Sequence, residues 1–330
     1  MTLSAAALRR IGVAGQLAFV GGIATWLASI GWHVAVALLA GIALVLLMFG
    51  ASIALAFAMS VHGLLPGANG VPALDPRMAA SRREARLGFL PALRCWLREC
   101  AAVLRMFDWL QPFASHRRFV SENADGAPVL LVHGYGCNHA VWLDLEPRLA
   151  AAGFRCEGID LEPVLGDIDD YATALLARLR AMTAAHGEPP LLVCHSMGGL
   201  AARAALVLAR RSGAGEVARG LVTLGTPHHG CTLAMFGSGI NARQMRCGNP
   251  WLQALAAGED AHARARMVSI FSWHDSIVGP AGASVLAGAR NVPLAGIGHV
   301  SLLRDPAVAQ ALVEALRRLS AAVANRAPAP

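Results

Sequence analysis

The first sixty residues carry an almost unbroken apolar pattern. Residues 11–61 contain no Asp, Glu, Lys or Arg, and His33 is their only titratable side chain. One membrane-spanning helix needs about 20 apolar residues, and backbone amides in hydrocarbon must be satisfied internally. The pattern therefore predicts a transmembrane helical hairpin over residues 1–61. Its two helices are placed at 12–30 and 34–54, with a turn at Gly31-Trp32-His33.

A cleaved signal peptide is the alternative for this segment, because Arg9 and Arg10 precede an apolar run. No small-residue cleavage site interrupts that run before the second helix begins, which favours the hairpin. Arg residues also follow the second helix, whereas the turn has none. The positive-inside rule then predicts that both ends, and the whole remaining domain, lie on the cytoplasmic side of the membrane.

Residues 62–118 form the next predicted unit, a linker followed by a basic amphipathic helix. Gly and Pro recur over 62–90, which is typical of irregular structure. Residues 91–110 place apolar side chains on one helical face and Arg on the other. This helix either lies at the bilayer surface or packs against the following domain. The predicted apolar face is Leu93, Trp96, Leu97, Cys100, Leu104, Phe107 and Leu110.

From residue 119 the pattern changes to short apolar runs that alternate with helical periodicity. Such runs predict parallel strands covered by helices on both faces, an α/β domain over 119–324. The Ala/Pro-rich tail at 325–330 is expected to be disordered. Strands are expected at 129–132, 154–159, 191–194, 220–224, 267–271 and 291–294, and helices at 142–152, 169–185, 198–211 and 306–324.

Charge and cysteine content narrow the class of protein. The net charge is +7 and all 28 basic residues are Arg, with nine of them between Arg77 and Arg118 against three acids. A basic block beside an apolar segment suits anionic lipid headgroups, and no nucleic-acid-binding motif accompanies it. The seven cysteines form an odd set without a C-x-x-C pair, which favours reduced thiols in a reducing compartment.

The segment around Ser196 has the order of a nucleophile elbow. A buried strand, Leu191 to Cys194, runs into a sharp turn at His195-Ser196 and then into a helix. A serine in such a turn exposes its hydroxyl above the sheet, at a helix N-terminus. Small residues two before and two after the serine avoid a clash; Gly198 fills the second place, and Cys194 stands where glycine is usual. Ser196 is thus the predicted nucleophile.

Residues 129–303 resemble the bacterial triacylglycerol lipase group of the α/β-hydrolases, through the elbow and several further segments. Leu130-Leu131-Val132-His133-Gly134-Tyr135-Gly136 ends the first strand with a His-Gly turn. The resemblance implies that the backbone N–H groups of Tyr135 and Met197 form the oxyanion hole. His133 is expected to brace the loop.

The acid and the base should both follow Ser196 in the chain, because this fold orders its triad Ser, Asp, His. The segment Gly296-Ile297-Gly298-His299 follows the last strand and resembles the Gly-x-Gly-His segment of the lipases. Asp275 follows the preceding strand and resembles their Asp-x-x-Val stretch. His299 is therefore the predicted base and Asp275 the acid that orients it.

Two further segments are candidates for the substrate cleft. Gly225-Thr226-Pro227-His228-His229-Gly230 matches a Gly-Thr-Pro-His segment of the same lipases. We expect His228 to line the cleft and predict no metal, because no carboxylate cluster at ligand spacing accompanies the histidines. The apolar insert 231–255 is either a short lid or part of the core. Its candidate substrate-contacting residues are Met235, Phe236 and Trp251.

The sequence as a whole predicts a membrane-anchored serine hydrolase of lipase or carboxylesterase type, acting through an acyl-enzyme. The alternatives are an acyltransferase or thioesterase on the same triad, or a non-catalytic membrane scaffold. The expected partners are a lipid or acyl-ester substrate and an anionic membrane surface. The expected location is the bacterial inner membrane, multi-pass, with the domain in the cytoplasm; no cofactor is expected.

Overall fold

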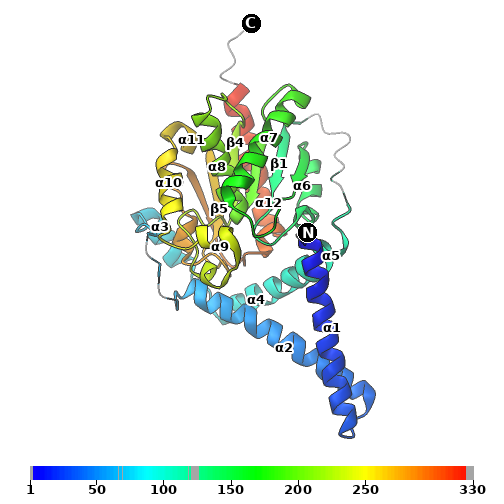
Figure 1. The fold of residues 1–330 in the computed structure, drawn as a ribbon. Helices are drawn as coiled ribbons and strands as arrows, with labels where there is room; N and C mark the ends of the chain where they lie inside the picture. Colours follow the sequence, from blue (N-terminus) through cyan, green and yellow to red (C-terminus); the bar gives the residue numbers. More distant parts are fainter. Residues whose placement is uncertain (1–2, 66, 69, 118, 120–125, 325–330) are drawn as a thin grey trace.

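The computed structural model describes residues 3–65, 67–68, 70–117, 119 and 126–324. The predicted tail at 325–330 lies outside these residues. A six-stranded parallel sheet of order β2-β1-β3-β4-β5-β6 forms the centre of the main body (Figure 1). The strands are β1 (Pro128–Val132), β2 (Arg155–Ile159), β3 (Leu191–His195), β4 (Gly220–Leu224), β5 (Met267–Ser272) and β6 (Arg290–Leu294).

Hydrophobic cores cover both faces of this sheet. Successive residues of a strand point to opposite faces, so Val129 and Leu131 of β1 join one core while Leu130 and Val132 join the other. The first core is closed by α6 (Glu146–Ala151) and α12 (Pro306–Ala324), and the second by α7 (Ile168–His186), α8 (Met197–Arg211) and α10 (Pro250–Gly258). Burial on both faces explains why the central strands β1 and β3 are continuously apolar over residues 129–132 and 191–194.

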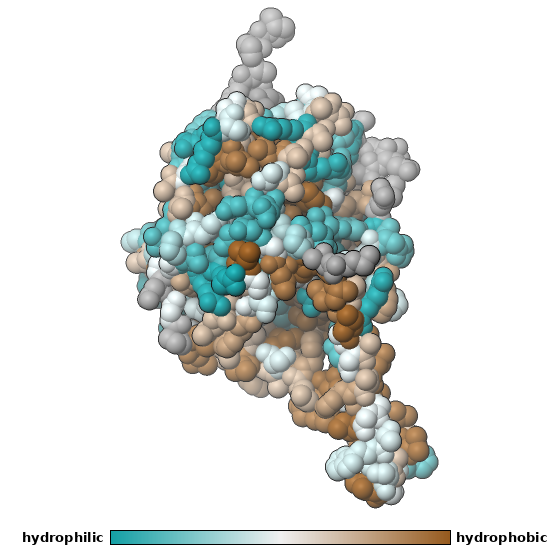
Figure 2. Space-filling model, viewed as in Figure 1, coloured by the Kyte–Doolittle hydropathy of each residue, from teal (hydrophilic) through white to brown (hydrophobic). Residues whose placement is uncertain are grey.

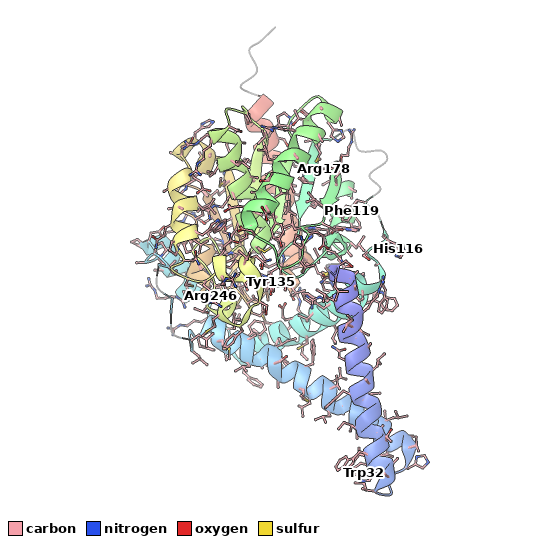
Figure 3. All side chains as sticks on the ribbon, in the orientation of Figure 1. Trp32, His116, Phe119, Tyr135, Arg178 and Arg246 are labelled. Carbon is pink, nitrogen blue, oxygen red and sulfur yellow. The ribbon has the colours of Figure 1, made fainter. Side chains whose placement is uncertain are left out.

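The helical hairpin projects away from this body, and Trp32 lies at its far tip (Figure 3). Its helices are α1 (Ala5–Ser29) and α2 (Val34–Val61), both longer than predicted. Each is long and apolar enough to cross a membrane. Large apolar side chains such as Leu17 and Leu47 are 67% and 69% exposed, and hydrophobic residues cover much of the hairpin surface (Figure 2).

The linker is more ordered than the sequence indicated, which corrects the prediction of irregular structure over 62–90. Helix α3 (Pro76–Glu84) lies within it. Asp75 caps this helix by accepting a hydrogen bond from the backbone N–H of Met78 at 2.8 Å, and Pro76 occupies its first turn. Pro at the first helical position after an Asp cap is a favourable start signal for a helix. The sequence Asp75-Pro76 therefore already indicated that a helix begins there.

The predicted amphipathic helix exists, as α4 (Phe89–Val103) continued by a π-helical turn η1 (Leu104–Leu110) and α5 (Gln111–Phe113). It packs on the α/β body and on α2, yet Leu93 and Leu97 stay exposed. The face through which the helix packs is therefore offset from the predicted apolar face, part of which stays exposed. The buried residues of α4 and η1 are Cys95, Glu99, Ala102, Met106 and Leu110.

Short helices and turns make up the remaining segments of the α/β body. The predicted helix at 142–152 is divided into the 3-10 turn η2 (His139–Trp142) and α6. The segment between β4 and β5 folds into several short helices. These are η3 (Thr232–Phe236), α9 (Gly239–Gln244), α10 and α11 (Ala261–Ala265), and two 3-10 turns follow later, η4 (Ala281–Ser284) and η5 (Ser301–Leu303).

Candidate active site

Ser196 occupies a strained turn between β3 and α8. Its φ is +54°, the only positive φ of a non-glycine residue among those the structure describes. Such a conformation is costly for an L-residue and persists where the surroundings enforce it. The surroundings are two hydrogen bonds: the Ser196 N–H donates to Leu224 O at 2.9 Å, and Thr226 Oγ1 donates to Ser196 O at 2.8 Å. This is the geometry of a nucleophile elbow.

Two glycines allow β1 and its loop to approach this elbow. A Cβ added at Gly198 would lie 2.6 Å from the backbone oxygen of Val132, and one at Gly134 would lie 2.9 Å from Cβ of Ser196. The loop after β1 is therefore pressed against the serine. Cys194, where the related pattern has glycine, is completely buried between β1 and β4 and contributes to the second core.

His299 and Asp275 form a buried hydrogen-bonded pair beside the elbow. His299 Nδ1 lies 2.8 Å from Asp275 Oδ2, and the two side chains are 6% and 1% exposed. The other carboxylate oxygen of Asp275 accepts from the backbone N–H groups of Ile277 at 2.9 Å and Val278 at 2.7 Å. All the acceptor atoms of this carboxylate are therefore engaged, which fixes its orientation toward the imidazole.

The protonation equilibrium of His299 is shifted by this environment. Burial alone lowers the pKa, but the charge and hydrogen bond of Asp275, together with the charge of Glu99, raise it above 6.5 overall. Next to it, burial holds the pKa of His195 well below its ordinary value, with the charge of His299 adding to the effect. The two rings lie with centroids 4.5 Å apart, and His195 Nε2 is 3.2 Å from His299 O.

The two residues predicted to form the oxyanion hole lie at the expected ends of their elements. Met197 is the first residue of α8, and N–H groups of the first helical turn lack an intrahelical acceptor. Tyr135 follows Gly134 at the sheet end that faces the hairpin (Figure 3). His133 braces this loop as predicted: its Nε2 accepts from Leu161 N at 3.0 Å, and its Nδ1 is 2.9 Å from Gly134 O.

A cavity of about 350 Å³ opens over Ser196 and His299. Its walls come from three parts of the chain. The α/β body contributes Gly134, Tyr135, His195 and Ile277 among others, η1 contributes Met106 and Phe107, and the hairpin contributes Arg9, Ser52, Ile53 and Ala56. The hairpin and the docked helix therefore complete a pocket whose floor carries the predicted nucleophile and base.

The hairpin is attached to the loops that border this pocket. Arg9 Nη2 donates to Gly136 O at 2.8 Å, and its guanidinium lies 4.1 Å from the centroid of the Phe107 ring. At the end of α2, the Ser60 hydroxyl donates to Asp275 O. One helix thus contacts the loop of Tyr135 and the other contacts the loop of the predicted acid.

Glu99 is a site residue that the sequence did not reveal. It lies on α4, is 1% exposed, and accepts hydrogen bonds from both loops that carry the predicted acid and base. In the sequence it is one of few acids in an Arg-rich block, where solvent exposure is the ordinary expectation. A signal was nevertheless present, since Glu99 shares a helical face with Cys95, Ala102 and Met106.

The structure does not bring His228 to the cavity. Its side chain is buried, with Nδ1 3.3 Å from Arg203 Nη1 and Nε2 3.2 Å from Thr223 Oγ1. The expected position on the cleft wall is therefore replaced by a packing position behind the elbow. Burial, followed by the charge of Arg203, holds the pKa of His228 well below its usual value.

The insert residues also lie away from the cavity lining. Met235 and Phe236 are 47% and 64% exposed, and Trp251 Nε1 donates to Asp169 Oδ2 at 3.0 Å. The insert is nevertheless attached to the site, because Tyr135 OH donates to Ser238 O at 2.9 Å. Within the described residues, no group of three or more His, Cys, Asp or Glu side chains is arranged to hold a metal ion.

Comparisons with known proteins agree with this architecture. Residues 129–329 match the alpha/beta hydrolase family, and the chain belongs to that family. The mature form of the lipase BlEst2 of Bacillus licheniformis is similar in structure, with a TM-score of 0.50 at 20% identity over 60% of this chain and 93% of that chain. Lipase B of Aspergillus fumigatus gives a TM-score of 0.52 at 19% identity, over 60% and 54%. These similarities show the fold. No curated protein sequence matches the chain.

Proposed function

We propose that this alpha/beta hydrolase is a membrane-anchored serine ester hydrolase, related in activity to bacterial triacylglycerol lipases. The observation that carries the proposal is the buried hydrogen bond between His299 and Asp275 beside the positive-φ Ser196, on the floor of one cavity. A serine, an imidazole and a carboxylate in this chain order are the parts required for nucleophilic acyl transfer in this fold.

The reaction proceeds in two acyl-transfer steps. His299 Nε2 accepts the hydroxyl proton as Ser196 Oγ attacks the ester carbonyl carbon, and Asp275 stabilises the resulting imidazolium. The backbone N–H groups of Tyr135 and Met197 donate to the developing oxyanion, each contributing about 3 kcal/mol. Collapse expels the alcohol, which takes the proton from His299. Water, activated by the same imidazole, then releases the acyl group as a carboxylic acid.

The hairpin is the proposed membrane anchor. Its apolar side chains are exposed to the surroundings along α1 and α2, which is costly in water and favourable in hydrocarbon. Arg residues flank it on the side of the catalytic body, so the positive-inside rule favours a cytoplasmic catalytic domain at a bacterial inner membrane. A lipid or other acyl ester is the substrate class that such a location supplies.

A fluorophosphonate probe tests the nucleophile directly, because it phosphonylates an activated serine. The wild-type protein in detergent should be labelled and should hydrolyse p-nitrophenyl butyrate, and Ser196→Ala should do neither. Ser212→Ala, on the surface beyond α8, is the matched control and should behave as wild type. Labelling that persists in Ser196→Ala would refute the assignment. Faster turnover with an added alcohol than with water would instead indicate an acyltransferase.

A further inference from the structure

The hairpin and the docked helix line the cavity over Ser196 mostly with apolar side chains, and Arg9, Ser52 and Glu99 are their polar members. Ile53 and Ala56 of α2 line this space together with Val103, Met106 and Phe107 of α4 and η1. The remaining polar side chains of the lining, His195, Ser196, Ser276 and His299 among them, come from the α/β body. A pocket with an apolar channel and a polar reactive end suits a molecule with a hydrocarbon chain attached to one ester.

We propose that this channel is the acyl-chain site for esters of bilayer lipids, and that the chain enters laterally from the membrane beside α2. The inference rests on the proposed function and names its substrate class. In this arrangement the hairpin is one wall of the substrate site as well as an anchor.

The position of the cavity along the hairpin supports a bilayer lipid as the substrate. The stretch of α2 from Val34 to Ile53 is about 28 Å long, and that of α1 from Ser29 back to Arg9 is about 30 Å, at 1.5 Å per residue. The hydrocarbon core of a bilayer is about 30 Å thick. If Trp32 lies at the far surface and the hairpin crosses the bilayer, these lengths would place the cavity near the boundary between hydrocarbon and headgroups of the near leaflet. The acyl ester bonds of glycerolipids lie at that boundary.

Arg9 is consistent with the same depth. It lines the cavity, stacks on Phe107 and donates to the loop of Tyr135, and a guanidinium is stable at the interface but costly deeper in the bilayer. A lipid in the near leaflet would therefore present its ester to Ser196 while its chain stays in an apolar environment throughout.

The test narrows the channel and measures chain-length preference in the full protein reconstituted in phosphatidylcholine vesicles. Ile53→Trp and Ala56→Trp should lower the ratio of kcat/KM for p-nitrophenyl palmitate over p-nitrophenyl butyrate by about tenfold or more. Leu55→Trp, whose side chain is 53% exposed on the outer side of α2, is the control and should leave the ratio unchanged.

An unchanged ratio in both channel variants would overturn the acyl-chain site. A wild-type protein that hydrolyses butyrate but not palmitate would also overturn it, while leaving the proposed esterase activity intact. A wild-type protein that hydrolyses neither ester and resists the fluorophosphonate probe would instead show that the proposed function itself is wrong.

A second inference comes from the hydrogen bonds of Glu99. Its Oε1 accepts from Ser276 Oγ at 2.6 Å and from Val300 N at 2.9 Å. Its Oε2 accepts from Ser301 N at 2.9 Å and Ser301 Oγ at 2.7 Å. Ser276 directly follows the predicted acid, and the other two residues directly follow the predicted base. One carboxylate from α4 therefore holds the two loops together.

The contact is tight and leaves little freedom. A Cβ added at Gly298 would collide with the Glu99 carboxylate, and Ser276 Oγ also accepts from His299 N at 3.2 Å. The donors to Glu99 are neutral amides and hydroxyls. A buried carboxylate with neutral partners is maintained at a cost in desolvation, which the hydrogen bonds from both loops offset.

We propose that Glu99 is a positioning residue for the acid–base pair, and that it makes the active site depend on docking of α4. Its role also rests on the proposed function. The titratable groups that face His299 are Asp275, Glu99 and His195. Behind Glu99, burial raises the pKa of Cys95 to about 12, with the charges of Glu99 and Asp275 adding to the effect of burial. Cys95 therefore stays an un-ionised thiol and adds no charge near His299. The two negative charges near the imidazole are those of Asp275 and Glu99, and loss of Glu99 removes one of them.

Glu99→Gln keeps the size of the side chain but removes its charge and half of its acceptor capacity. We expect kcat for p-nitrophenyl butyrate to fall by about 10²-fold with little change in KM, and the acidic limb of the kcat/KM profile to move to lower pH. Glu99→Asp should recover part of the activity and keep the limb near its wild-type position. The exposed Glu84→Gln is the control.

The positioning role would be overturned if the acidic limb of the kcat/KM profile of Glu99→Gln stayed at its wild-type pH. It would also be overturned if the substitution raised KM and left kcat unchanged. Full activity in Glu99→Gln would overturn it as well. Labelling of Ser196 by the fluorophosphonate in the wild-type protein, measured alongside, shows separately that the proposed function holds.

Discussion

The hydroxyl of Ser60, near the end of α2, donates a hydrogen bond to the backbone oxygen of Asp275. The hairpin is therefore joined to the loop that carries the predicted catalytic acid. A second close contact lies beside it, because a Cβ added at Gly279 would collide with the backbone of Ser60. The end of α2 and the acid loop consequently form one packed unit. A displacement of the hairpin should therefore move Asp275 and lower the rate of hydrolysis.

Gly279→Ala should separate the two segments and lower kcat for a soluble ester by about 10²-fold, since displacements near 1 Å have effects of that size. Gly282→Ala is the matched control in the same loop, because the nearest atom to its Cβ would be a Leu74 methyl group at 3.3 Å. The measurement is steady-state hydrolysis of p-nitrophenyl butyrate in detergent. Equal activity of the two variants would contradict the coupling.

The acidic limb of the pH profile should report His299. A general base must be neutral, and the pKa of His299 is raised above 6.5 by Asp275 and Glu99 against the opposing effect of burial. Activity should therefore fall as the pH drops through a midpoint above 6.5. Asp275→Asn should lower kcat by about 10⁴-fold and move the midpoint of the residual activity downward. A midpoint that stays in place would show that another group titrates.

The same pKa shift predicts the pH dependence of stability. Because His299 binds its proton more tightly in the folded state, its contribution to the free energy of unfolding is fully present below the unfolded pKa of about 6.5. The contribution is lost as the pH rises through the folded pKa. We therefore expect the free energy of unfolding, measured with urea in detergent, to depend differently on pH above about 6.5 in the wild type and in His299→Gln. The same pH dependence in both proteins would contradict the assignment.

Gly134→Ala should damage the elbow without disturbing the rest of the sheet. The added Cβ would lie 2.9 Å from Cβ of Ser196 and 3.3 Å from His195 O, so the serine or the Tyr135 loop must move. We expect kcat to fall by about 10²-fold. Gly88→Ala, where an added Cβ meets nothing within 4 Å, is the control. A circular dichroism melt confirms that both variants are folded.

Stability should depend on the buried ion pair between Arg203 of α8 and Glu259. Arg203 Nε and Nη2 lie 2.6 and 2.8 Å from the two carboxylate oxygens, and the side chains are 1% and 2% exposed. Glu259→Ala leaves a buried guanidinium without this partner, which should cost about 3–5 kcal/mol in urea unfolding. Arg290→Gln breaks the exposed pair with Glu314 and should change stability by less than about 1 kcal/mol.

Membrane topology is tested by a reporter at the C-terminus. If the hairpin crosses the bilayer twice, green fluorescent protein fused there should fluoresce in the bacterial cytoplasm, whereas alkaline phosphatase fused at the same place should be inactive. Replacing Arg9 and Arg10 with Gln should weaken this orientation, because the flanking Arg residues determine it under the positive-inside rule. An active phosphatase fusion of the wild-type sequence would reverse the proposed orientation.

The sequence by itself determined the sheet and the hairpin. Continuous apolar strands such as Leu191 to Cys194 are buried on both faces, and a pattern of that kind has one economical arrangement. The strand–turn–helix pattern around Ser196 is local, so the sequence shows it directly. The order of Ser196, Asp275 and His299 follows from the topology of the fold and can also be predicted from the sequence. The helix α3 was missed although its Asp75-Pro76 start signal is local.

Only the tertiary structure decided which groups from the first hundred residues meet the predicted active site. Glu99 is about 200 positions from its partners Val300 and Ser301, and Ser60 is similarly remote from Asp275. Whether a helix such as α4 buries one face or the adjacent one depends on the surface that receives it, because small rotations change the contacts while leaving the periodicity unchanged. The same physics removed His228 from the cleft: the buried Arg203 provides a partner that no local pattern encodes.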